Sequence, residues 1–249
     1  QGGSLGGNGG QVETSSHDNL QAMGSVNVAA PLGTSGNWLL DPANVTIQTG
    51  GTGALSGNIF NPASDSTIDP TTISSALTNG STVTITASCA PCASNPSKGN
   101  LTIANSINRV ATGTATLNLN ADASITMNAG VGITSTAGNP LNVTMSAASV
   151  LGLTGGITTN GGAVTLGAGN GITATAAPIN TSGGDVTVIN TPPLNNASAA
   201  SIVFNTASAI NAGTGNVTVR NGPLAVQAGL GAITLGTLTG KNITIHNNL

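Results

Sequence analysis

The sequence predicts an all-β protein that folds as a parallel β-helix (a β-solenoid) in a single elongated domain with extruded loops. Three observations predict it. Short alternating strand segments recur to the end of the chain, glycine-bearing corners separate them, and they return at a period near 22 residues. A period of about 20–50 residues is typical of solenoids, in which each coil covers the hydrophobic face of the next.

The strand segments place β-branched or aliphatic residues at alternate positions, with threonine or asparagine between them. This alternation puts apolar side chains on one face of a strand and polar ones on the other. Helix-forming residues are scarce, and we expect one helical turn, 71–77, with Asp69 as its cap and Pro70 at its first position. The expected strands include 45–47, 83–86, 117–119, 125–127, 143–145, 164–166, 186–188, 217–219, 233–235 and 243–245.

The period is visible in valines that follow a glycine corner. Val143, Val164 and Val186 are 21 and 22 residues apart, and the next such valine, Val217, follows after 31. The excess falls in the proline-rich segment 191–196, which we expect to be a loop extruded at one corner before the rung resumes. In three repeats an isoleucine precedes the valine by seven residues: Ile157, Ile179 and Ile210.

We expect the β-helix to cover the whole chain, 1–249, in three parts. Residues 1–47 carry sequence motifs, and 48–100 form irregular rungs with loops rich in proline, serine and asparagine. Residues 101–249 form regular rungs of about 22 residues, with an insertion near 190–200. No signal peptide is visible at Gln1, so we expect a fragment or a processed product.

Charged residues make up only 4% of the 249 residues and aromatic residues 1%, and the formal net charge is -3. About a quarter of residues are usually charged. The few bases form no stripe that would bind phosphates, which argues against nucleic acid. No apolar run approaches the ~18 residues of a membrane-spanning helix, so we expect no membrane insertion. Stacked rungs place like side chains side by side, where charges repel and Thr or Asn ladders are tolerated, so this composition fits the fold.

Two segments near the amino end carry a more specific signal. Residues 6–15 read Gly-Gly-Asn-Gly-Gly-Gln-Val-Glu-Thr-Ser, and residues 36–47 read Gly-Asn-Trp-Leu-Leu-Asp-Pro-Ala-Asn-Val-Thr-Ile. They resemble the G-G-x-V-E-T-S and W-L-L-D-P-x-N-V-T-I signatures of filamentous-haemagglutinin-like exoproteins of two-partner secretion. The motif match covers about a fifth of the chain. The matching residues are Val12, Glu13, Thr14, Ser15, Trp38, Leu39, Leu40, Asp41 and Pro42.

The resemblance implies a right-handed parallel β-helix that is secreted or held at the surface of a Gram-negative bacterium. It also implies export through an outer-membrane transporter and a role in adhesion, aggregation or biofilm, with a glycan or protein of a host or neighbouring cell as partner. The N-P-N-L and N-P-N-G-I motifs of the family's secretion domain are absent from this sequence. The resemblance therefore places the segment downstream of that domain, in the shaft.

Cys89 and Cys92 form the motif Cys-Ala-Pro-Cys. At the start of a helix this pattern lowers a thiol pKa and supports redox chemistry, but here a loop sequence follows. We expect a disulfide that staples an extruded loop, with redox activity as the alternative. A zinc site would need two further ligands, and His17 and His246 are far away in the sequence.

Two further candidate sites have a structural alternative. Trp38, followed by Asp41-Pro42, could form a carbohydrate platform, but we favour a structural plug or turn. Asp65 and Asp69 could bind calcium, yet they lie in a Ser/Asn/Pro-rich segment without a glycine-rich nonapeptide array, and we favour a plain loop.

Asn-x-Thr sequons recur along the chain and are acceptors for N-glycosylation in secreted proteins. We favour a structural interpretation, in which Asn begins a strand at a corner and Thr faces outward. The sequon asparagines are Asn44, Asn100, Asn142, Asn216 and Asn242.

We expect no enzymatic activity, no cofactor and no metal. The chain has many serines but just two histidines, and the glycine cluster 167–171 leads into another strand rather than into a phosphate-binding helix. A carbohydrate-cleaving β-helix would need clustered carboxylates, whereas the seven acids are scattered.

Two non-enzymatic alternatives remain beside the adhesin shaft. One is a homo-oligomer or self-assembling filament that stacks end to end through open rungs. The other is an ice-binding solenoid, although its Thr-x-Thr groups do not recur at the rung period. Those groups are Thr82/Thr84/Thr86, Thr112/Thr114/Thr116, Thr134/Thr136 and Thr173/Thr175.

Overall fold

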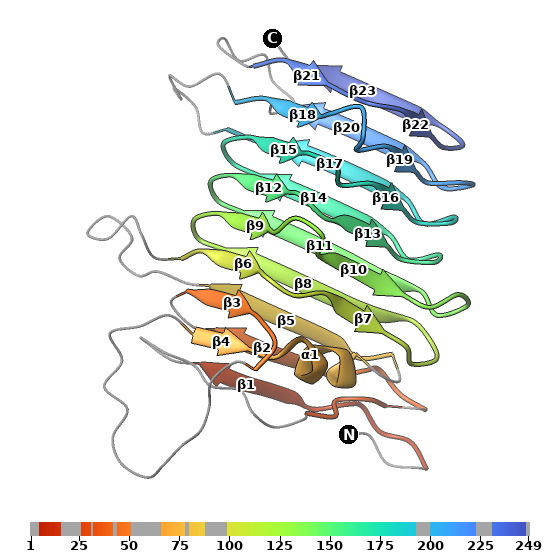
Figure 1. Ribbon diagram of the computed structural model, residues 1–249. Helices are drawn as coiled ribbons and strands as arrows, with labels where there is room; N and C mark the ends of the chain where they lie inside the picture. Colours follow the sequence, from red (N-terminus) through yellow and green to blue (C-terminus); the bar gives the residue numbers. More distant parts are fainter. Residues whose placement is uncertain are drawn as a thin grey trace.

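The computed structural model confirms the predicted fold class. The chain is nearly all β and winds into three long parallel sheets that stack rung on rung (Figure 1). One short helix interrupts the strands within the part of the chain that the structure describes. That part comprises residues 5–15, 26–30, 32–41, 44–50, 66–77, 80–87, 99–192, 200–222 and 231–247.

Nine strands form the longest sheet, and every neighbouring pair is parallel. In spatial order they are β1 (Gln11–Ser15), β2 (Asn37–Asp41), β5 (Thr82–Ala87), β8 (Ala115–Ala121), β11 (Leu141–Ala147), β14 (Val164–Ala168), β17 (Val186–Asn190), β20 (Val217–Asn221) and β23 (Ile243–Asn247).

The two other sheets have eight and six strands among the described residues. The eight-stranded sheet runs β21 (Ile233–Thr234), β18 (Ile202–Phe204), β15 (Ile172–Ala174), β12 (Leu151–Leu153), β9 (Ile125–Met127), β6 (Leu101–Ile103), β3 (Val45–Ile47) and β4 (Ser66–Ile68). The six-stranded sheet runs β22 (Leu238–Thr239), β19 (Ile210–Asn211), β16 (Ile179–Asn180), β13 (Gly156–Thr158), β10 (Gly132–Ser135) and β7 (Ile107–Arg109). From β5 onward each rung visits the nine-, eight- and six-stranded sheets in that order.

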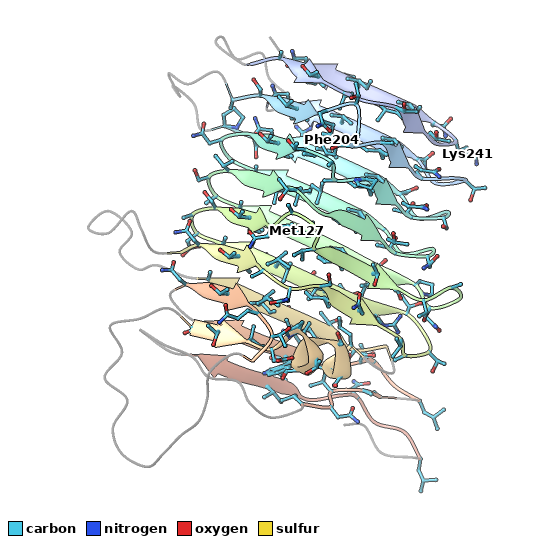
Figure 2. All side chains as sticks on the ribbon, in the orientation of Figure 1. Met127, Phe204 and Lys241 are labelled. Carbon is cyan, nitrogen blue, oxygen red and sulfur yellow. The ribbon has the colours of Figure 1, made fainter. Side chains whose placement is uncertain are left out.

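The core is a column of aliphatic side chains inside the coil. The register stacks Val143, Val164, Val186 and Val217 on one another, and each is at most 1% exposed. Burying one such side chain stabilises the fold by about 1.5–3 kcal/mol. Larger side chains lie inside the same coil, as Figure 2 shows for Met127 and Phe204.

The register confirms the repeat predicted from the sequence. Ile157 pairs with Ile179, which pairs in turn with Ile210. The glycine corners have a steric cause, because a Cβ on Gly184 would lie 2.1 Å from the carbonyl oxygen of Gly162 in the rung below. Only glycine allows that close approach of two backbones.

The predicted insertion lies where the sequence placed it, between β17 and β18. The register pairs Val186 directly with Val217, so the stack of rungs continues in register after the insertion. Residues 193–199 of this insertion lie outside the described residues.

The predicted helix is confirmed as α1 (Pro70–Ala76), with Asp69 as its N-cap and Pro70 in the first turn. It packs against β7, the end strand of the six-stranded sheet. Strand β4 departs from the rung order: it follows β3 in the sequence but pairs on the side of β3 away from β6. α1 and β4 lie near the amino-terminal end of the coil, where β1 is the outermost strand of the nine-stranded sheet (Figure 1).

Candidate functional site

The two motif segments lie side by side. Residues Val12, Glu13, Thr14 and Ser15 belong to β1, and Trp38, Leu39, Leu40 and Asp41 belong to β2; the strands pair in parallel with Val12 opposite Trp38 and Ser15 opposite Asp41. The structure thus joins the V-E-T-S and W-L-L-D segments, which the sequence separates by one rung, into one structural unit. Pro42 lies outside the described residues.

Trp38 is a plug in the core. Its side chain is 1% exposed and belongs to the same buried cluster as Val28 and Val83, whereas Val12, one strand earlier, is 37% exposed. A buried ring presents no face on which a sugar could stack. The structure therefore supports the plug interpretation of Trp38 and contradicts the carbohydrate platform.

Asp69 holds two segments together through both carboxylate oxygens. Its Oδ1 accepts hydrogen bonds from the backbone N–H of Thr71 at 2.8 Å and from the Thr71 hydroxyl at 2.6 Å, and its Oδ2 accepts one from the backbone N–H of Gly50 at 3.0 Å. The hydrogen bonds from Thr71, side chain first, hold the pKa of Asp69 below its ordinary value. Asp69 therefore serves as a helix cap, and Asp65 lies outside the described residues.

Of the other titratable candidates, the structure describes only His246. Cys89, Cys92 and His17 lie outside the described residues, so the predicted disulfide stays a prediction. His246 lies in β23. Among the residues that the structure describes, no group of three or more His, Cys, Asp or Glu side chains is placed to hold a metal ion.

Arg109 is the main polar residue that the sequence analysis missed. Its side chain is 1% exposed, and its guanidinium group donates hydrogen bonds to five carbonyl oxygens and one hydroxyl. Burial lowers the pKa of Arg109. The signal was present in the alternation of Ile107, Asn108 and Arg109, which puts the third residue inward. The acceptors are Leu77 O, Thr112 O, Gly113 O, Asn139 O, Pro140 O and Ser135 Oγ.

A buried asparagine pair lies in the carboxyl-terminal half of the coil. The Nδ2 of Asn190 donates to the Oδ1 of Asn221 at 2.7 Å, and both side chains are 0% exposed. Asn221 donates in turn to the carbonyl oxygens of Ala200 at 3.0 Å and Gly231 at 2.9 Å. The pair donates to backbone carbonyl oxygens at two corners of the coil, and strand alternation again places both residues inward.

The sequon asparagines bond from one rung to the next. The Oδ1 of Asn44 accepts the backbone N–H of Asn100 at 2.9 Å, and the Oδ1 of Asn100 accepts that of Ser124 at 3.2 Å. The Oδ1 of Asn142 accepts the N–H of Ala163 at 2.9 Å. In each case the donor is the equivalent residue one rung later. These contacts support the structural interpretation of the Asn-x-Thr pattern.

Outward-facing threonines form columns in register. Within the nine-stranded sheet one column runs through five successive rungs, although the Thr-x-Thr groups seen in the sequence do not themselves align. The eight-stranded sheet carries a comparable column, so the threonine columns do not distinguish one face of the coil as an ice-binding plane. The first column comprises Thr144, Thr165, Thr187, Thr218 and Thr244, and the second includes Thr67, Thr46, Thr102 and Thr126.

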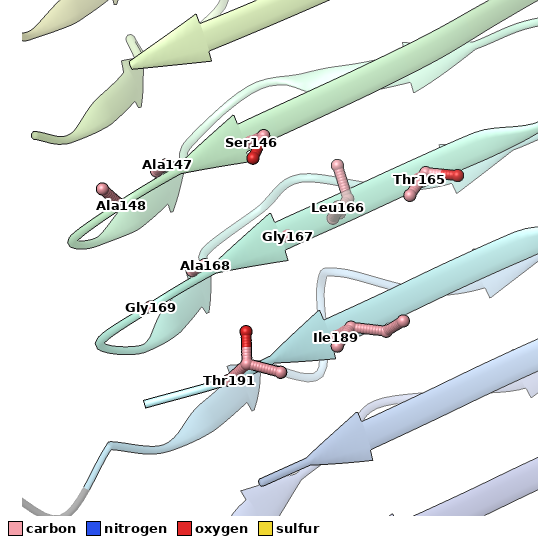
Figure 3. Close-up of a pocket in the computed structure, with 10 residues that line it drawn as sticks. All are labelled: Ser146, Ala147, Ala148, Thr165, Leu166, Gly167, Ala168, Gly169, Ile189 and Thr191. Carbon is pink, nitrogen blue, oxygen red and sulfur yellow. The ribbon is translucent and has the colours of Figure 1, made fainter. Parts of the chain in front are cut away.

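The glycine cluster 167–171 contributes to a shallow groove on the outer face of the nine-stranded sheet. Gly167 lies in register between Ser146 and Ile189 and has no side chain, which leaves a hollow with a volume of 530 Å³ (Figure 3). Its lining consists of small and hydroxyl-bearing residues together with Leu166 and Ile189, and it contains no charged group. β14 leads into β15 (Ile172–Ala174), so the strand predicted to follow the glycine cluster is confirmed.

Within the described residues, no helix is long and apolar enough to cross a membrane. Family models, curated proteins and solved structures gave no match to this chain.

Proposed function

We propose that this chain is a stiff, non-enzymatic shaft segment of a filamentous-haemagglutinin-like adhesin at the surface of a Gram-negative bacterium. It holds adhesive surfaces away from the cell and serves attachment, aggregation or biofilm formation. Export through an outer-membrane transporter is part of the same proposal.

One observation carries the proposal: three parallel sheets continue through successive rungs around a single aliphatic core. Bending such a rod would require the breaking of backbone hydrogen bonds in at least one sheet. Each rung adds about 4.8 Å to the length, so the shaft grows by simple addition of rungs.

The pairing of β1 with β2 gives independent support. The residues that carry the family resemblance form neighbouring strands, and the largest of them, Trp38, packs inside the coil. Their spacing matches one rung, which is the arrangement expected if the motifs specify the coil itself rather than a ligand site.

The outer surface suits contact with neutral polar partners. The threonine columns and sequon asparagines present hydroxyl and carboxamide groups with little charge between them. Such groups hydrogen-bond to glycans and to backbone edges. We therefore propose a host or neighbouring-cell glycan or protein as the partner of the exoprotein, with this segment as spacer or contact surface.

The test compares cells that display the chain with cells that do not. We expect antibodies against the chain to label intact cells from outside, and displaying cells to attach or aggregate more than the controls. Deletion of one rung, residues 143–163, should leave labelling and attachment intact, because Asn142 then leads into Val164 at the position of Val143. Labelling confined to the cell interior, or cleavage of a polysaccharide by the purified chain, would overturn the proposal.

A further inference from the structure

Several Asn-Gly pairs lie between the strands of the coil or at their ends. Asparagine followed by glycine is the pair most prone to deamidation, because glycine has no side chain to hinder attack by its backbone nitrogen on the asparagine carboxamide. The pairs among the described residues are Asn8-Gly9, Asn160-Gly161, Asn170-Gly171 and Asn221-Gly222.

The corner after β14 requires glycine at position 171. The φ angle of Gly171 is +124°, a region that residues with a side chain rarely adopt, and a Cβ there would lie 3.3 Å from the carbonyl oxygen of Ser201. A bulkier residue that would slow the deamidation of Asn170 therefore does not fit this corner.

The glycine N–H of each of these pairs donates a hydrogen bond to a neighbouring rung. In three of the four pairs the acceptor is a backbone carbonyl oxygen, which no substitution removes. In Asn170-Gly171 the acceptor is a side-chain atom, the Oδ1 of Asn190, at 2.8 Å. The backbone acceptors are Thr34 O for Gly9, Thr181 O for Gly161 and Asn190 O for Gly222.

The carboxamide of Asn190 is fixed in the orientation that this bond needs. Asn190 is 0% exposed, and its Nδ2 donates to the Oδ1 of Asn221 at 2.7 Å, so its own Oδ1 is turned to Gly171. The adjacent N–H of Thr191 donates to the carbonyl oxygen of Ala168 at 2.8 Å, which holds the two rungs together beside the corner (Figure 3).

We propose that Asn170 is a deamidation site and that Asn190 is the positioning residue that suppresses the reaction. In this reaction the backbone nitrogen of Gly171 forms a bond to the Cγ of Asn170 and gives up its proton. The bond from Cγ to Nδ2 breaks, and the side-chain nitrogen leaves with that proton as ammonia. Water then adds its hydroxyl to either carbonyl carbon of the succinimide and its proton to the ring nitrogen, which gives aspartate or isoaspartate.

The hydrogen bond to Asn190 opposes the first step. While the N–H of Gly171 donates to the Oδ1 of Asn190, its nitrogen keeps its proton and cannot turn toward the Cγ of Asn170. The corner must open locally before the bond to Cγ can form, and such openings have their own free-energy cost. The rate of deamidation at Asn170 is therefore set by the acceptor on the neighbouring rung.

The modification would change the corner that leads into β15. Both products add a negative charge, and isoaspartate also lengthens the backbone by a methylene carbon. Ile172 follows closely, is 0% exposed and pairs with Leu151 and Ile202. A longer backbone at this corner would disturb the register of the eight-stranded sheet. The proposal goes beyond the shaft function and does not depend on it.

Peptide mapping by mass spectrometry after incubation at neutral pH tests the role of Asn190. Asn190→Leu removes the acceptor and should raise deamidation of Asn170 relative to Asn160 by about tenfold, the factor expected for the loss of one hydrogen bond. Asn160 is the internal reference, because the acceptor of its glycine is a backbone carbonyl oxygen. The matched control is Asn221→Leu, which breaks the same buried pair but keeps the Oδ1 of Asn190 and should leave the ratio unchanged.

Hydrogen exchange of the unsubstituted chain supplies a second measurement that needs no variant. The amide of Gly171 should exchange as slowly as that of Gly222, to within about tenfold, because both donate to Asn190. An amide of Gly171 that exchanges at the rate of the unfolded chain would overturn the proposal. The same holds if Asn190→Leu, while folded by circular dichroism, leaves the ratio of Asn170 to Asn160 unchanged, or if Asn221→Leu raises it equally.

Discussion

The Nε of Arg109 donates a hydrogen bond of 2.7 Å to the carbonyl oxygen of Leu77, the C-cap residue of α1. The same guanidinium group reaches Gly113 at 2.6 Å and Asn139 at 2.9 Å. One buried cation therefore joins the carboxyl-terminal end of α1 to two corners of the regular coil. Free carbonyl oxygens inside a protein are costly, and arginine has the fixed fork of donors that can satisfy several at once.

Replacement of Arg109 with methionine should destabilise the protein by about 3 kcal/mol or more, because it leaves several buried carbonyl oxygens without donors. Urea denaturation followed by circular dichroism measures the change. The matched control is Arg220→Met, which loses a single hydrogen bond of 3.3 Å to Gly222 and should cost about 0.5 kcal/mol or less. Equal shifts for the two variants would contradict the clamp role of Arg109.

The buried asparagine pair predicts a second large effect. Asn221→Leu should cost about 2–3 kcal/mol, since it removes the buried acceptor of the Asn190 Nδ2 and one donor each to the carbonyl oxygens of Ala200 and Gly231. Asn211→Ala removes an exposed asparagine that accepts only the N–H of Gly213 and should change stability little. The double variant Asn190→Leu, Asn221→Leu should cost less than the sum of the single changes, because the partners act together. Additive costs would show that the pair is not coupled.

Two substitutions in the Asn142 sequon distinguish a structural role of the asparagine from a role in glycosylation. Asn142→Ala should lower the free energy of unfolding by about 1 kcal/mol, because the N–H of Ala163 loses its acceptor. Thr144→Val removes the sequon as well but keeps a β-branched side chain on the outer face, so it should be nearly neutral. Thermal unfolding and intact mass check both. An equal loss of a glycan mass and of stability in the two variants would favour glycosylation.

The lowered pKa of the helix cap Asp69 predicts that its contribution to the stability of the fold depends on pH. Because the folded-state pKa of Asp69 lies below its ordinary value, the carboxylate stabilises the fold above the unfolded-state pKa, and this stability is lost as the pH falls through the folded-state pKa. Asp69→Asn should therefore lower Tm modestly at neutral pH, and the difference from the unsubstituted chain should narrow below about pH 4. The effect is small because the side chain is largely solvated. A Tm difference that stays constant across this range would contradict the assignment.

Local patterns were enough to predict most of the fold. The columns built on Val164 and Ile179 follow from alternation and from a period that the glycine corners mark. Helix α1 follows from the adjacent Asp69 and Pro70, because capping needs only neighbouring residues. These features are specified within one rung, so the sequence alone could show them.

Features that depend on distant partners were not predicted. The alternation placed Arg109 inward, but its acceptors come from corners at Leu77, Gly113 and Asn139, which only the closed coil brings together. The threonine columns, by contrast, could be predicted, because the alignment of Val186 with Val217 also places Thr187 beside Thr218. The pairing of the two motif segments was within reach, since Gln11 and Asn37 lie about one rung apart.

Strand β4 pairs with β3 on the side away from β6, although β4 is synthesised after β3. The amino-terminal coils thus stay unfinished until residues 66–77 have emerged and turned back against the direction of synthesis. Every later rung, by contrast, pairs with a rung that precedes it in the sequence. The amino-terminal rungs therefore require one backward closure, whereas every rung from β6 onward stacks in chain order.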